Sequence, residues 1–351
     1  MDALGLSKDA DISPQLAMRK LMAGFQVSRV LHVAAELGIA DLLADGPRSS
    51  DELAGSTGTH APALHRVLRA LVSLGVFAED ERGRFTLTPL GATLRTGVPG
   101  SVRALALLIL GGEHYQAWSD LMYSVRTGGT ALDHVLELGI WDYYAKDQDR
   151  AKIFNEAMEN LKGLFDEAVV ASYSFCAFGT VVDVGGGNGS LMAMLLKANP
   201  RLKGMVFDLP RVAEVAKRRI AQAGLTERCK VVGGDAFVSV PSGGDAYVLS
   251  RVIHDWDDAH SIAILKNCRR AISETGRVLL LERVLPLRID QSPTTQAAVL
   301  GDVNMLAVTG GRERTESEYR TLYDAAGFRL TRVIPTPSGI SVIEGAPGAM
   351  S

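Results

Sequence analysis

A histidine with acidic neighbours is the residue of this sequence best suited to acid–base chemistry. Leu249-Ser-Arg-Val-Ile-His-Asp-Trp-Asp-Asp258 places His254 just after a short apolar run. An imidazole exchanges a proton near neutral pH, and at the carboxyl end of a strand beside a nucleotide site it is well placed as a general base. Two simpler interpretations stay open: a buried neutral histidine, and capping of the next helix by Asp255, Asp257 and Asp258.

Two further acids and a polar segment are candidates for the same site. Glu282 follows three leucines, where a carboxylate is costly unless it is paired or functional. Glu313 lies in Gly310-Gly-Arg-Glu-Arg-Thr315, just before the last long predicted helix, where capping or ion pairing is the simpler role. Asp302 and Asn304 are candidates for lining the same cavity.

A glycine-rich turn indicates a nucleotide-type cofactor. Thr180-Val-Val-Asp-Val-Gly-Gly-Gly-Asn-Gly-Ser190 is typical of a strand, a tight turn and a helix start. Glycines such as Gly185 and Gly187 suit positive φ and close approach of backbone to a ligand. A dinucleotide fingerprint requires its last glycine where Ser190 stands, which argues against a nicotinamide oxidoreductase.

Two carboxylates strengthen that signal. Asp208, followed by Leu209, ends the second predicted strand about 20 residues past the turn, where an acid binds ribose hydroxyls. Asp235 ends the third, followed by Ala236 and Phe237, where it can accept from an adenine amino group while the phenyl ring lies on the base. Either aspartate alone is explained by a helix N-cap. Their place at successive strand ends favours a cofactor site.

Alternating strands and helices are expected to position these residues. The last two strands, joined by Pro335-Thr-Pro-Ser-Gly339, are predicted to be antiparallel, which is more typical of methyltransferases than of dinucleotide dehydrogenases. The predicted strands lie near 180–184, 203–207, 229–233, 246–250, 277–283, 328–334 and 340–344, and the helices at 190–198, 210–223, 259–272 and 315–326.

The first half of the chain is predicted to be a separate module. Residues 13–44 have apolar stripes on more than one helical face, which predicts a homodimer through this region, with packing on their own domain as the alternative. Residues 49–95 are typical of a winged helix. Its second helix offers only His65, Arg66 and Arg69 to DNA, so a structural role is favoured over DNA binding.

Residues 101–172 are predicted to be mostly helical and are rich in aromatic residues and methionine. The simpler interpretation is core packing, and the functional one is the wall of an apolar pocket for a flat ligand. The residues concerned are Trp118, Met122, Trp141, Tyr143, Tyr144, Phe154 and Met158. The predicted division of the chain is therefore 1–100, 101–175 and 176–351.

Composition narrows the class of protein. The 351 residues are 47% hydrophobic and 22% charged, which is ordinary for a globular protein, and a net charge of −3 argues against nucleic acid as a partner. The three cysteines are not at CxxC spacing, so neither a disulfide framework nor a zinc site is expected. Without a signal peptide or an apolar run of roughly 20 residues, we expect a cytoplasmic protein with no membrane partner.

Together these motifs resemble the class I S-adenosylmethionine-dependent O-methyltransferases of the caffeic acid and acetylserotonin type, including bacterial members that act on secondary metabolites. The resemblance covers nearly the whole chain. It implies a Rossmann-like α/β sheet with a terminal antiparallel hairpin, preceded by a winged-helix dimerisation domain. It rests on FNEAM at 154–158, VVDVGGGNG, FDLP, GDAF, LSRVIHDWDD, LLLERVLP and GGRERT.

The resemblance implies a role for each candidate. His254 is the catalytic base, and Glu282 and Glu313 hold it in orientation; the sequence does not settle whether one of these or Asp302 is its main partner. Ser250 stands where several plant members have lysine, so Arg251 is a substitute for that contact. The candidate cofactor contacts are Asp183, Gly185, Gly187, Asp208, Leu209, Asp235, Ala236, Phe237, Ser250, Arg251 and Trp256, and the candidate acceptor contacts are Trp141, Phe154, Met158, Asp255 and Asn304.

The expected activity is methyl transfer from S-adenosylmethionine to a hydroxyl of a small aromatic or polycyclic secondary metabolite. No metal is expected, because the leaving sulfur is already cationic and departs neutral. Hydroxylation or decarboxylation on the same scaffold, and methylation of nitrogen or carboxyl groups, remain alternatives.

Overall fold

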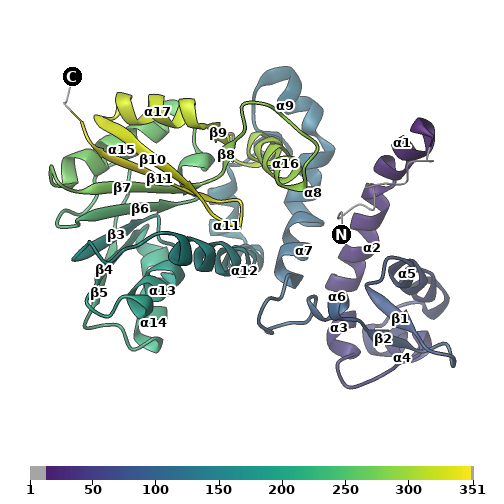
Figure 1. The fold of residues 1–351 in the computed structure, drawn as a ribbon. Helices are drawn as coiled ribbons and strands as arrows, with labels where there is room; N and C mark the ends of the chain where they lie inside the picture. Colours follow the sequence, from purple (N-terminus) through teal and green to yellow (C-terminus); the bar gives the residue numbers. More distant parts are fainter. Residues whose placement is uncertain (1–12, 349–351) are drawn as a thin grey trace. The chain divides into compact units, whose positions relative to one another are not determined.

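The computed structural model describes residues 13–348, which form two compact units (Figure 1). The first, here the N-terminal unit, comprises Met1–Ser119 and Val135–Leu161, as far as they are described. The second, here the C-terminal unit, comprises Asp120–His134 and Lys162–Ser351, with the same restriction. The three-segment division made from the sequence stays a prediction.

The N-terminal unit is helical apart from one hairpin. Ser13 caps the first helix and Pro14 begins it, as the sequence predicts, and a capping box between Ser49 and Glu52 opens the fourth. The order helix, helix, hairpin, helix of a winged helix is confirmed. The elements are α1 (Pro14–Met22), α2 (Gly24–Glu36), α3 (Ile39–Leu42), α4 (Ser50–Thr57), α5 (Ala61–Ser73), β1 (Phe77–Glu79), β2 (Phe85–Leu87), α6 (Pro89–Ala92), α7 (Arg103–Ile109), α8 (Gly112–Ser119) and α11 (Ile140–Lys146).

Two helices belong to both units: α10 (Ala131–Leu136) and the long α12 (Gln148–Ser172). In the N-terminal core, Leu64, Leu68 and Leu71 lie on one face of α5 and are buried. They belong to one cluster with Phe77 and Phe85 of the hairpin. Burial of these three leucines packs α5 against the hairpin of β1 and β2.

The C-terminal unit is built on a seven-stranded sheet of order β10-β11-β7-β6-β3-β4-β5. Strands β3 to β7 pair in parallel, while β11 runs antiparallel to both β7 and β10, so the predicted terminal hairpin is confirmed. The strands are β3 (Thr180–Val184), β4 (Lys203–Asp208), β5 (Cys229–Gly233), β6 (Ala246–Ser250), β7 (Arg277–Glu282), β10 (Phe328–Pro335) and β11 (Ser341–Pro347).

Helices cover both faces of this sheet (Figure 1). All residues of β6 are buried, because parallel strands with helices on both sides have no solvent-facing surface. The carboxyl ends of the parallel strands meet at one edge, where open α/β sheets bind ligands. The covering helices are the end of α12, α13 (Ser190–Ala198) and α14 (Pro210–Gln222) on one face, and α15 (Asp258–Ala271) and α17 (Glu316–Ala325) on the other.

The sequence patterns missed one long helix, α16 (Pro293–Val308), which carries Asp302 and Asn304. Its start has the same Ser-Pro signal as α1, and the Ser292 hydroxyl accepts from the Thr295 amide. Its apolar residues are spread around the helix, so periodicity gave no signal. The segment predicted to be mostly helical also contains α9 (Leu121–Thr127). Other elements that were not predicted are the 3₁₀ turn η1 (Ile253–Asp255) and the short strands β8 (Val284–Leu285) and β9 (Arg314–Thr315). Among the described helices, none is both long and apolar enough to cross a bilayer.

The glycine turn after β3 yields a stability prediction. Gly185 has φ +69°, and a Cβ there would lie 2.7 Å from Cγ2 of the stiff Val252 side chain. Gly224 has the same φ but open space around it, so it is a matched control. Gly185→Ala should lower the free energy of unfolding by about 1–3 kcal/mol more than Gly224→Ala. Urea unfolding of the cofactor-free variants measures the difference, and equal losses would contradict the close approach.

Candidate active site

The glycine turn is hydrogen-bonded to the end of β4. Gly185, Gly187 and Gly189 all have positive φ, as a turn of this type requires. The amides of Gly185 and Gly186 donate to the carbonyl oxygen of Phe207, at 2.8 and 3.3 Å. The turn is therefore tied to the strand that carries the next predicted cofactor residue.

Asp208 completes this link. Its Oδ2 accepts from the Gly187 amide at 2.8 Å and its Oδ1 from the Leu209 amide at 2.7 Å. Asp183, at the end of β3, is almost completely buried. The turn, Asp183 and Asp208 thus lie together at the carboxyl edge of the sheet, as predicted.

An aromatic pair lies beside the end of the third strand. Oδ1 of Asp235 accepts from the Phe237 amide at 2.8 Å, so part of its role is to shape the loop that also contains Ala236. The Phe237 ring stands edge-on against Trp256, with centroids 4.8 Å apart. This pair offers an apolar surface of the kind that a flat base contacts.

Arg251 has a strained backbone for a residue that is not glycine, with φ +53°. It directly follows the buried Ser250. Its guanidinium lies 3.8 Å from Asp166 and 5.2 Å from the centroid of the Phe165 ring. Asp166 is 1% exposed. Sequence patterns gave no signal for Phe165 and Asp166, because both lie on α12, far from Arg251 in the sequence.

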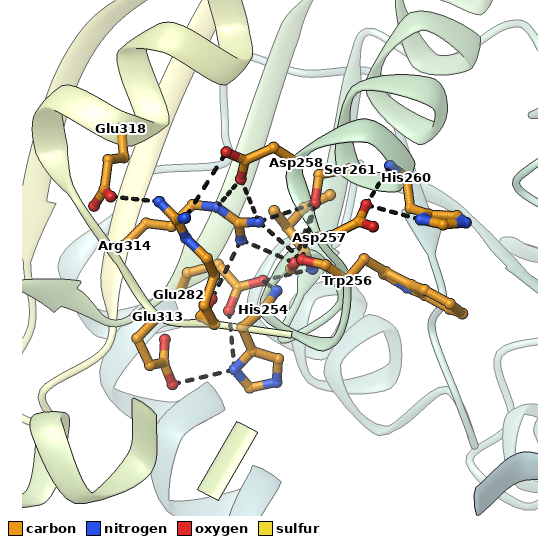
Figure 2. Close-up of polar contacts among 12 residues, drawn as sticks. His254, Trp256, Asp257, Asp258, His260, Ser261, Glu282, Glu313, Arg314 and Glu318 are labelled. Atoms are coloured by element: carbon orange, nitrogen blue, oxygen red, sulfur yellow. Dashed lines mark hydrogen bonds and ion pairs between the residues drawn. The ribbon is translucent and has the colours of Figure 1, made fainter. Parts of the chain in front are cut away.

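His254 lies between carboxylates (Figure 2). Its Nδ1 is 3.3 Å from Glu313 Oε1 and 3.5 Å from Glu282 Oε2. Its Nε2, on the opposite side of the ring, is 3.7 Å from Asp255 Oδ1. The ring is not turned into the protein core, since 15% of the side chain is exposed. The fold therefore brings together the three residues predicted to be catalytic.

Both glutamates contact the same nitrogen, but they are held differently. Glu282 is fully buried, and its Oε1 accepts from the amides of Val252, Ile253 and His254 at 3.0, 2.9 and 3.4 Å. The amide of Glu313 instead donates to Asp302, at 2.8 Å. Asp302 therefore positions Glu313.

Arg314 and Gly311 hold the GGRERT segment against the turn that carries His254. Arg314 is fully buried and donates to the carbonyl oxygens of Ile253 and Trp256, at 3.1 and 2.8 Å, and to Asp258 (Figure 2). A Cβ at Gly311 would lie 1.9 Å from the His254 carbonyl oxygen, so only glycine fits. Sequence patterns indicated no role for either residue, although both belong to the GGRERT motif.

The carboxylates control the charge of His254. Burial by itself lowers the pKa of its imidazole, but the negative charges of Glu282, Asp255 and Glu313 outweigh burial and raise that pKa to about 9. Burial, assisted by Glu313 and opposed by His254, raises the pKa of Glu282 to about 7. Without ligand, the ring therefore holds a proton at neutral pH.

The same three side chains are of metal-ligand type. Ligand atoms of His254, Glu282 and Glu313 all lie within 4.8 Å of one another. Sequence spacing indicates no cluster of metal ligands, because the three residues are far apart in the chain. Carboxylates that orient a histidine through one ring nitrogen give the same arrangement without an ion.

The predicted acceptor residues do not all belong to the same unit. Trp141, on α11, packs edge-on against Phe154 of α12, with centroids 5.9 Å apart, and Met158 lies one turn further along that helix. All three belong to the N-terminal unit, whereas Asp255 and Asn304 belong to the C-terminal unit. Trp141 and Phe154 pack together; their role as acceptor contacts stays a prediction.

The charge cluster yields a titration prediction. The pKa of His254 in the ligand-free protein should lie near 9, well above the ordinary value of 6.5. Glu282→Gln removes a negative charge beside Nδ1 and should move that pKa down. Glu316→Gln, on the exposed side of α17, should leave it unchanged. NMR titration of the ring, assigned by its absence in His254→Ala, measures all three. A wild-type pKa at or below 6.5 would contradict the cluster's effect.

Comparison with known proteins places this geometry in a family. Residues 118–329 match the O-methyltransferase domain, and residues 19–97 match the O-methyltransferase dimerisation domain. The chain is 45% identical to a phenazine O-methyltransferase of Lysobacter antibioticus, over 93% of this chain and 95% of the relative. It is 33% identical to a phenazine-1-carboxylate N-methyltransferase of Pseudomonas aeruginosa, over 93% and 96% of the two chains.

A solved structure extends the match to the cofactor. It is an O-methyltransferase from neocarzinostatin biosynthesis in complex with S-adenosylmethionine and 2-hydroxy-5-methyl naphthoic acid. The TM-score is 0.80 at 34% identity, covering 92% of this chain and 96% of that one. The chain belongs to the family of S-adenosylmethionine-dependent O-methyltransferases that carry an N-terminal dimerisation domain.

Proposed function

We propose that this enzyme methylates a hydroxyl group of a small aromatic acceptor and that His254 is the general base. The observation that carries the proposal is the position of His254, with Nδ1 at 3.3 Å from Glu313 and 3.5 Å from Glu282. Two carboxylates at Nδ1 favour a proton on that nitrogen. The neutral ring then presents an unprotonated Nε2, which is the atom able to take a proton.

The residues at the sheet edge suit the cofactor. The turn at Gly185 leaves bare backbone where a Cβ would meet Val252. Asp208 and Asp235 provide carboxylates at successive strand ends, and Phe237 with Trp256 provides the apolar surface. We infer that these groups hold S-adenosylmethionine, together with Asp183, Gly187, Leu209, Ala236, Ser250 and Arg251.

His254 would act on the acceptor hydroxyl. S-adenosylmethionine, when bound, supplies a methyl group on a cationic sulfur that leaves as a neutral thioether. A phenol has a pKa of about 10, so its ionisation at pH 7 costs roughly 4 kcal/mol. Nε2 of His254 takes the hydroxyl proton as the oxygen forms its bond to the methyl carbon, and Glu282 and Glu313 stabilise the imidazolium.

The carboxylates around His254 also restrict when its ring can act as a base. With its pKa raised to about 9, the ligand-free ring holds a proton at neutral pH and cannot accept another. A positive charge bound beside the ring favours the neutral form. We therefore expect His254 to be competent as a base only when a cationic ligand is bound or the pH is high.

We further propose that the acceptor lies against the aromatic cluster of Trp141 and Phe154, with Met158, Asp255 and Asn304 as additional contacts. The named substrates of the similar proteins are flat aromatic compounds. Methylation of a ring nitrogen is the second candidate, because one relative of comparable coverage is an N-methyltransferase. A nitrogen lone pair needs no base, so the base variant distinguishes the two.

We also infer a homodimer through α1. This helix exposes apolar side chains in a region that overlaps the dimerisation-domain match at residues 19–97. Isolated surface leucines are normal, but several on one helix indicate an interface. The exposed apolar residues of α1 are Leu16, Met18, Leu21 and Met22, and Phe25 at the start of α2 is exposed as well.

His254→Ala should lower kcat by at least about 10²-fold on a phenolic acceptor, because it removes the base. Binding of S-adenosylhomocysteine, measured by calorimetry, should stay within a few-fold of wild type. His60→Ala, exposed at the start of α5, is the matched control and should retain full activity. Near-normal methylation of oxygen by His254→Ala would remove the base assignment, and retained transfer to nitrogen alone would support the second candidate.

Met22→Asp combined with Phe25→Asp should convert the dimer to a monomer, because each buried carboxylate would lack a partner at the interface. Light scattering after size-exclusion chromatography should give twice 37.5 kDa for wild type and 37.5 kDa for the variant. Leu74→Asp, at an exposed site after α5, should remain dimeric. A wild-type monomer would refute the inference.

A further inference from the structure

Helix α15 holds the loop that follows β5 through a buried side chain to which no role has been assigned. Asn267 of this helix is only 3% exposed, and its Nδ2 donates to the carbonyl oxygen of Ala236 at 2.6 Å. Ala236 lies between Asp235 and Phe237, which are proposed above to contact the cofactor. This hydrogen bond therefore joins the body of the helix to a loop of the cofactor site.

The neighbouring Arg270 identifies the two ends of the Asn267 amide. Its guanidinium donates to Asn267 Oδ1, and a guanidinium can only donate. The other end of the amide is therefore the NH2 group, which meets the Ala236 carbonyl, a group that can only accept. Both ends of this buried amide are hydrogen-bonded, so its orientation is fixed.

The peptide group between Ala236 and Phe237 is hydrogen-bonded on both of its sides. Its carbonyl oxygen accepts from Asn267, and its N–H donates to Oδ1 of Asp235 at 2.8 Å. Because a peptide group is planar, holding its carbonyl also sets the direction of its N–H. Asn267 thus orients the Asp235 carboxylate through one rigid peptide group, and Oδ2 of that carboxylate is the oxygen left for a ligand.

His260 supports the same loop from two turns earlier on α15. Positions seven residues apart lie on one face of a helix, so His260 and Asn267 contact the loop from the same face. The His260 ring stands edge-on to that of Phe237, with centroids 5.6 Å apart. It also lies 5.8 Å from the Trp256 ring (Figure 2). His260 therefore supports the aromatic surface of the site, whereas Asn267 supports its carboxylate.

We propose that Asn267 is a positioning residue for the adenine of S-adenosylmethionine, because it aims the Asp235 carboxylate at the 6-amino group. The inference rests on the proposed function, in which Asp235 and Phe237 hold the cofactor. It goes further by naming the residue that makes the loop selective for this amino group. Asn267 acts through the loop and touches no reacting atom, so its loss changes cofactor recognition rather than the base.

The test compares S-adenosylhomocysteine with S-inosylhomocysteine, in which an oxygen replaces the 6-amino group. Calorimetry on the wild-type protein should show about tenfold or more tighter binding of the adenine ligand, because the analogue has no amino group to donate to the carboxylate. Asn267→Leu keeps a branched side chain but loses the donor. The ratio of the two affinities should then fall to about threefold or less, since the carboxylate is no longer aimed.

Two matched variants separate recognition from a general loss of structure. Tyr173→Phe removes another buried hydrogen bond of 2.6 Å in the same unit, from the Tyr173 hydroxyl to Glu344, and should leave both affinities unchanged. His260→Ala weakens the aromatic surface, which contacts adenine and hypoxanthine alike, so both affinities should fall together and their ratio should stay. A ratio that narrows equally in either variant overturns the specific role of Asn267.

A second variant and a direct measurement support the test. Asn267→Ala suits the interior of a helix and should narrow the ratio as the leucine variant does. Thermal unfolding monitors the fold of every variant. In the wild-type protein, the side-chain amide resonance of Asn267, assigned by its absence in Asn267→Ala, should shift when S-adenosylhomocysteine binds. It should shift less with S-inosylhomocysteine.

The outcomes distinguish this inference from the proposed function. A wild-type ratio that survives in a folded Asn267 variant overturns the inference and leaves the proposed function standing. An Asn267 amide resonance that does not respond to the adenine ligand does the same. Equal affinity of the wild-type protein for the two ligands overturns the proposed contact between Asp235 and adenine, and the inference with it.

Discussion

The site depends on one buried carboxylate. Glu282 accepts from three consecutive amides with one oxygen, while the other lies 3.5 Å from His254 Nδ1. Removing a carboxylate from water costs several kcal/mol, and charge-assisted hydrogen bonds of about 1.5–3 kcal/mol each offset that cost. The group that shapes the η1 turn is therefore also the group that places the ring of His254, the proposed base.

The HDW and GGRERT segments depend on each other for a steric and an electrostatic reason. Gly311 lets the backbone pass against the His254 carbonyl oxygen, and the buried Arg314 donates to carbonyl oxygens of the same turn. Glu313, between them, can then reach Nδ1. The proposed base is thus held by its ring and by its backbone, which preorganises it before any acceptor is present.

The residues proposed for chemistry and those proposed for acceptor recognition belong to two compact units. The proposed base and cofactor groups belong to the C-terminal unit, whereas the aromatic cluster of Trp141 and Phe154 belongs to the N-terminal unit. This division suits a family whose named members act on different aromatic compounds.

Local pattern was enough to identify much of this protein. Apolar periodicity located all seven strands of the main sheet, and the glycines at 185, 187 and 189 located the turn. Strands and tight turns can be predicted in this way because each depends on residues that are neighbours in the sequence. The His254 segment marked the proposed base, and its motif partners indicated the family.

Tertiary structure decided which distant side chains meet. The sequence did not distinguish Glu282, Glu313 and Asp302 as partners of His254; in the fold the first two reach Nδ1 and Asp302 bonds the Glu313 amide. It also gave no signal for α16 or for the ion pair between Glu113 and Arg150. Such contacts join residues far apart in the chain, and only the packing of whole elements determines their distances.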